Sequence, residues 1–98
     1  MSQAGELPRI STIEPLPSFS LKVRWSEGRR AGREDIVDLL PIIDIYKIYR
    51  PLRNNEELFA SAKLWDDGYA VAWDGVDLEV SAGTIHILAS WEEYLESP

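Results

Sequence analysis

Apolar and polar residues alternate strictly from Phe19 to Trp25, and this alternation constrains the fold more than any other feature of the chain. A period of two is that of a β-strand, and it puts the four apolar side chains of the segment on one face. The Ser-Glu-Gly sequence at 26–28 offers a turn with a glycine for positive φ, so we expect the chain to reverse into another strand over residues 29–39. The alternation therefore predicts a hairpin with a basic outer surface.

The rest of the chain carries strand and helix signals in turn. We expect further strands at residues 9–14, 62–64, 69–73 and 76–80, and helices at residues 41–49, 56–60 and 81–95. Pro15 is predicted to stop the first strand and Pro51 to end the first helix. Asn54 or Asn55 is a candidate cap for the second helix, and Ser81 for the last.

These elements predict one α+β domain at residues 9–98 after a flexible leader at 1–8. The expected architecture is a two-layer sandwich: a largely antiparallel sheet of two hairpins plus a short strand, with small helices and a C-terminal helix on one face. Four Trp, four Tyr and two Phe in 98 residues supply the area for a core. We expect Trp25, Trp73 and Trp91 to meet in it, with Leu88 and Leu95 on the buried stripe of the last helix.

Charge and cysteine content narrow the function classes. Ten Lys and Arg against seventeen Asp and Glu give a net charge of −7, which makes nucleic acid an unlikely partner. The first 33 residues hold six basic and three acidic groups, whereas residues 34–98 hold four and fourteen. The chain has no cysteine and no long apolar run, so we expect a cytoplasmic protein without membrane contact.

Catalytic and cofactor motifs are missing from the sequence. It has no phosphate-binding loop, no dinucleotide fingerprint and no nucleophile elbow. The carboxylates between Asp66 and Glu79 lack the spacing of a calcium loop, so we expect no metal and no cofactor. His86 is the only histidine, and any histidine-based hydrolase or transferase chemistry would need it. We expect it on the polar face of the last helix, as a surface residue.

Arginines around the turn of the first hairpin are the sharpest charged feature. The candidate interaction residues are Arg24, Arg29, Arg30, Arg33 and Trp65. Guanidinium groups crowded at a hairpin tip bind carboxylates or phosphates in pairs, and they can equally pair with acids of their own strands. Trp65 is out of phase with Leu64, so it is predicted either on the outer sheet face, as an anchor for a partner, or packed at the sheet edge.

Several segments resemble a small bacterial family known as domain of unknown function 2442. The matching segments are Ile13 to Gly28, Val37 to Pro41, Tyr49 to Arg53, Leu58 to Phe59 and Gly68 to Leu78, within residues 9–85. The chain departs from the family at the shorter loop Asp74-Gly75. The resemblance implies a two-layer α+β domain and no reaction; some relatives precede a helix-turn-helix, and others are encoded beside small partner proteins. No helix-turn-helix is expected here.

We therefore expect a small cytoplasmic bacterial protein that is a non-enzymatic protein-protein interaction module. Its partner would be a second copy of the chain or a protein encoded nearby, and the second case includes an antitoxin-like role. One alternative is binding of an anion or nucleic acid through the basic hairpin. The other is a small hydrolase or transferase that uses His86.

Overall fold

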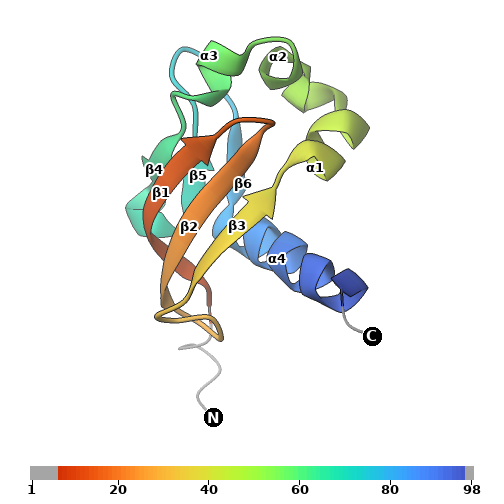
Figure 1. Cartoon of the computed structure of the whole chain (residues 1–98). Helices are drawn as coiled ribbons and strands as arrows, with labels where there is room; N and C mark the ends of the chain where they lie inside the picture. The colour runs from red at the N-terminus through yellow and green to blue at the C-terminus, as the bar shows by residue number, and fades with distance from the viewer. Residues whose placement is uncertain (1–6, 97–98) are drawn as a thin grey trace.

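The computed structural model describes the backbone of residues 7–96 and the side chains of residues 7–91, so most of the expected leader lies outside the described residues. The chain is an α+β domain, as predicted (Figure 1). Its elements are β1 (Arg9–Leu16), β2 (Ser20–Glu27), β3 (Glu34–Asp38), α1 (Leu40–Ile45), η2 (Lys47–Tyr49), α2 (Arg50–Arg53), α3 (Glu56–Phe59), β4 (Lys63–Trp65), η3 (Asp66–Gly68), β5 (Ala70–Ala72), β6 (Glu79–Ser81) and α4 (Ala82–Glu96). The strands form two antiparallel three-stranded sheets, ordered β1-β2-β3 and β4-β5-β6, where a single sheet was expected.

The first sheet confirms the alternation found in the sequence. Phe19, Leu21, Val23 and Trp25 are all buried, and they face the core together with Val37 of β3. β1 continues through Pro15, which was expected to end it. The proline is tolerated because β1 is an edge strand, where a missing N–H breaks no ladder on the free side.

β3 begins later than predicted, because residues 28–33 form a loop. The Arg33 N–H donates to the Arg30 carbonyl and the Gly32 N–H donates to the Trp25 carbonyl, so the loop satisfies its own backbone groups before the strand starts. The turn predicted at residues 26–28 is therefore a longer loop, and the strand expected over residues 29–39 covers only Glu34–Asp38.

The second sheet lies beside the first, with β4 near β1 (Figure 1). The Asp-Asp-Gly turn predicted for its hairpin is present as η3, and all three residues have positive φ. A side chain at Gly68 would overlap the Ile10 carbonyl oxygen, so only glycine lets η3 come this close to β1.

The helical segment after β3 is divided into short pieces. The predicted helix over 41–49 ends at Ile45 and continues as the 3₁₀ turn η2. Pro51 stands in the first turn of α2, so it begins a helix where it was expected to end one. Asn55 caps α3 through its side chain, and Ser81 caps α4 by accepting from the Thr84 N–H, as predicted.

α4 packs along β3 and buries a different stripe from the predicted one. Ala82, Ile85 and Ala89 are buried, whereas the indole of Trp91 is 56% exposed. The prediction of Trp91 in the core is therefore wrong, and Leu95 lies outside the described side chains. Trp25 and Trp73 are buried as expected.

Candidate functional site

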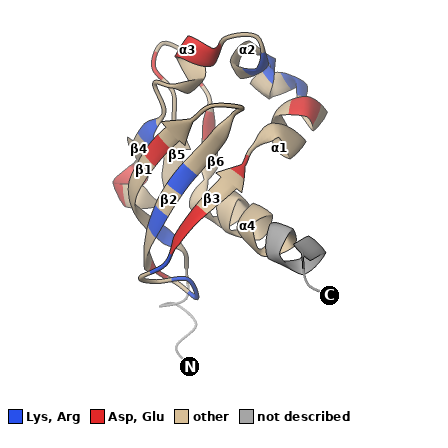
Figure 2. Ribbon diagram, viewed as in Figure 1, with Lys and Arg blue, Asp and Glu red and all other residues tan. Residues whose placement is uncertain are grey.

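The hairpin tip carries three of the four predicted arginines on its surface. Arg24, Arg29 and Arg33 are exposed, and Figure 2 shows basic residues at the loop between β2 and β3. Arg30 is only 5% exposed, so its expected place in a surface cluster is wrong. The arginines therefore divide into a surface group and one buried group.

Arg30 points inward because the carboxylate of Asp35, five residues later on β3, lies beside it. Its Nη1 donates to Asp35 Oδ2 over 3.1 Å, and its Nη2 lies 3.4 Å from Ser90 Oγ of α4. Trp25 Nε1 donates to the same Asp35 oxygen over 2.8 Å. The guanidinium thus ties the hairpin loop to the last helix instead of being available to an external anion.

Acids lie beside the exposed basic residues of the first sheet and its hairpin loop. Arg24 is paired across the sheet with Glu34 in the strand register, and Lys22 Nζ lies 4.0 Å from Glu34 and 3.9 Å from Glu14. Arg33 Nη2 lies 3.6 Å from Asp35. Neighbouring carboxylates cancel much of the positive potential that a phosphate chain would need.

His86 packs against the core more than predicted. Its ring is 5.7 Å from that of Trp25 in an edge-to-face arrangement, and the side chain is half-buried. The shallow hollow beside it is lined by Ile87, Ser90 and Trp91, with no carboxylate among the described residues that line it. The constellation of histidine, acid and nucleophile that a hydrolase needs is not formed by these residues.

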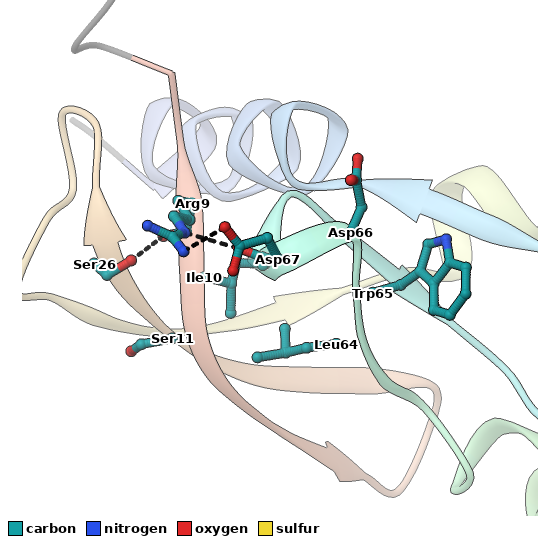
Figure 3. Close-up of a pocket in the computed structure, with 9 residues that line it drawn as sticks. Arg9, Ile10, Ser11, Ser26, Leu64, Trp65, Asp66 and Asp67 are labelled. Carbon is teal, nitrogen blue, oxygen red and sulfur yellow. Dashed lines mark hydrogen bonds and ion pairs between the residues drawn. The ribbon is translucent and has the colours of Figure 1, made fainter.

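Trp65 is exposed on the outer face of the second sheet, the first of its two predicted places, with 55% of its surface accessible. A hollow at the β1–β4 boundary is lined by Arg9, Ser11, Ser26, Leu64 and Asp67 among others, and Figure 3 shows Trp65 turned away from Arg9 and Asp67.

Arg9 holds the η3 turn in place. Its Nη2 lies 2.8 Å from Asp67 Oδ2, its Nε donates to the Asp67 carbonyl over 2.7 Å, and its Nη1 lies 3.2 Å from Glu27. The hydrogen bond to Asp67, followed by that to Glu27, raises the pKa of the guanidinium. Arg9 is thus already engaged within the chain.

An apolar surface that the sequence analysis missed lies on the helices. Tyr46, Ile48, Ile87 and Trp91 are 55%, 62%, 67% and 56% exposed, and we call these four residues the helical face. Tyr46 and Ile48 line a hollow with Thr84 of α4. Ile87 follows Thr84 by three residues and Trp91 follows Ile87 by four, and these two side chains line a second hollow on the same helix. The signal was present in the sequence: residues 82–91 contain no charged residue, so α4 has apolar groups on more than one side.

Within residues 7–91, His, Asp and Glu nowhere gather into a group of three that could hold a metal ion. No helix in the described part of the chain is long and apolar enough to cross a bilayer.

Comparison with known proteins found no matching family model, no matching curated protein and no matching solved structure.

Proposed function

We propose that this protein is a non-enzymatic interaction module that associates with a second copy of itself through the helical face. The observation that carries the proposal is the exposure of two apolar pairs that flank Thr84 of α4: Tyr46 and Ile48 line one hollow with Thr84, and Ile87 and Trp91 line a second hollow farther along the helix. Large apolar side chains gathered on one face of a small domain mark a contact surface, whereas single exposed ones are ordinary.

The size of the helical face fits a dimer. With about three-fifths of each side chain exposed and roughly 200 Å² per large side chain, four such residues present on the order of 500 Å² per copy. A two-fold contact then buries roughly 1,000 Å² before its rim is counted, which is the lower bound for a specific interface. Ile45 is exposed next to Tyr46 and extends the rim.

The net charge of each copy opposes association at long range, but the α4 part of the contact has no charged residue at short range. Each copy carries −7, so two copies repel at low ionic strength. Because residues 82–91 of α4 have no charge, the α4 part of the contact has no ion pair that salt could weaken. Self-association is therefore expected to strengthen as salt is raised.

The proposal includes the expected cytoplasmic location and the resemblance to domain of unknown function 2442. A reducing compartment suits a chain without cysteine. Anion or nucleic-acid binding has less support, because Arg30 is buried and acids stand beside Arg24 and Arg33.

Light scattering coupled to size exclusion, at 50 mM and 500 mM salt, tests the proposal on three proteins. The unchanged chain is expected to be dimeric, more fully so at high salt. Ile87→Lys puts a charge in the helical face and is expected to give a monomer. Ile36→Lys is the matched control, because Ile36 is 61% exposed on β3, outside the helical face, and it should leave the dimer intact.

An unchanged chain that is monomeric at both salt concentrations overturns the proposal. A dimer that survives Ile87→Lys also overturns it, because the contact would then lie elsewhere. If the chain is a monomer and binds only a protein encoded beside it, that protein would be the occupant of the helical face. This result counts against self-association.

A further inference from the structure

On the outer face of the second sheet, the large ring of Trp65 lies next to the alanines of β5. The strand register places Trp65 opposite Ala70, and Lys63 opposite Ala72 and then Glu79. Because only the small Ala72 lies between Lys63 and Glu79, Trp65 borders a shallow hollow of about 300 Å³ that is also lined by Lys63, Asp77 and Glu79. Trp65 therefore has room beside its exposed ring for a flat group.

In two other places in the described part of the chain, an arginine contacts both an aromatic ring and a carboxylate. Arg9 lies 5.5 Å from the centre of the Tyr69 ring while pairing with Asp67. Arg53 lies 5.7 Å from the centre of the Phe19 ring, and its Nε is 3.0 Å from Asp44 Oδ1. In both cases the ring attracts the cation and the carboxylate fixes its orientation.

The hollow beside Trp65 holds a ring, carboxylates and the cation of Lys63, and this cation pairs with Asp74. Asp74 is engaged, because Lys63 Nζ lies 2.6 Å from it. Asp77 and Glu79 form no ion pair with any residue in the described part of the chain. The surrounding sequence strengthens the attraction for a cation, since residues 34–98 carry fourteen acids against four bases.

We propose that the Trp65 face, made of Trp65, Asp77 and Glu79, binds an arginine side chain in an exposed segment of a partner protein. A guanidinium is favoured over an ammonium because it is planar, stacks on an indole and offers a fork of donors to a carboxylate. The Trp65 face lies on the second sheet and the helical face on the helices, so this inference does not depend on the proposed self-association.

The test is an NMR titration of the full chain with two capped tripeptides, acetyl-Gly-Arg-Gly-amide and acetyl-Gly-Lys-Gly-amide. The Trp65 indole N–H is expected to shift saturably with the arginine peptide, at least about threefold more tightly than with the lysine peptide. The Trp91 indole is an internal control in the Ile87→Lys chain, where the proposed dimer does not cover it, because it is 56% exposed but the described residues that line its hollow include no acid. It should not move.

Two variants and a control separate binding from general acidity. Glu79→Gln is expected to weaken binding of the arginine peptide about twofold to fivefold. Trp65→Ala is expected to weaken it about as much, and because this variant lacks the Trp65 indole, its binding is followed through the Asp77 backbone amide. Glu56→Gln removes an exposed acid in α3 and should change nothing. Ile87→Lys should bind the peptide normally even if the dimer is lost, so failure of one proposal is distinguishable from failure of the other.

Equal binding of both peptides, equal shifts of the Trp65 and Trp91 indoles, or full binding by Glu79→Gln would each overturn the inference. The unchanged chain could instead show a higher solution mass at low salt, and Trp65→Ala could abolish this increase. Such a result would identify the Arg29 side of a second copy as the occupant. That result would also overturn it.

Discussion

Replacing Arg30 with methionine removes the cation from the most buried charged contact in the described part of the chain. The Arg30 and Asp35 side chains are 6% and 14% exposed, with Nη1 and Oδ2 3.1 Å apart. Breaking a buried pair by removing one partner costs about 3–5 kcal/mol, because the remaining charge stays out of water. Arg33 Nη2, 3.6 Å from Asp35, compensates part of this charge, so we expect a loss near the lower figure, about 3 kcal/mol.

Urea denaturation followed by tryptophan fluorescence measures this loss, since Trp25 shares the Asp35 oxygen with Arg30. For a domain of this size, about 3 kcal/mol corresponds to a melting temperature lower by roughly 12–24 °C. Arg29→Met is the matched control, because Arg29 precedes Arg30 in the sequence and is exposed, and we expect a change within about 0.5 kcal/mol. An Arg30→Met protein as stable as the control would refute the claim that the buried ion pair holds the hairpin loop.

Three further predictions concern single positions. Ser18 has φ of 66° in the β1–β2 turn, so Ser18→Gly should raise the free energy of unfolding by roughly 0.5–1 kcal/mol in urea melts. Gly68→Ala should cost about 3 kcal/mol or prevent folding, whereas Gly75→Ala, with positive φ but open space, should cost only about 1 kcal/mol by the same measurement. Burial, then the Glu79 carboxylate, raises the pKa of Tyr49, so ultraviolet titration should show a late-ionising phenol that Tyr49→Phe removes. Its neutral form is favoured in the folded state, so its contribution to stability is complete below the ordinary tyrosine pKa and is lost as pH rises above it.

The strands and caps were predictable because their signals are local. Alternation from Phe19 to Trp25 needs only the period of two, and the caps at Asn55 and Ser81 need only one side chain and a nearby N–H. Pro51 was misread because proline is compatible both with the residue after a helix and with the first turn of the next one.

The buried stripe of α4 was not predictable in the same way. Between Ala82 and Trp91 the helix has no charged residue to mark the solvent side, so several stripes fit the sequence equally well. Packing against β3 selects the stripe with alanine at 82 and 89, because small residues let the helix approach the sheet closely. The larger Trp91 side chain stays on the surface, which explains why the prediction that it lies in the core is wrong.

The burial of Arg30 and the exposure of Trp91 follow from the same arrangement of α4. Arg30 reaches Ser90 and the Trp25 ring meets His86, so the hairpin contacts one side of the helix at two successive turns. A helix fixed on that side presents Ile87 and Trp91 in a set orientation, and it loses little conformational freedom when they are covered. Trp65 is likewise carried by a paired strand beside the η3 turn that Arg9 holds. Both proposed contact surfaces therefore rest on elements ordered before binding, which allows small areas to support specific association.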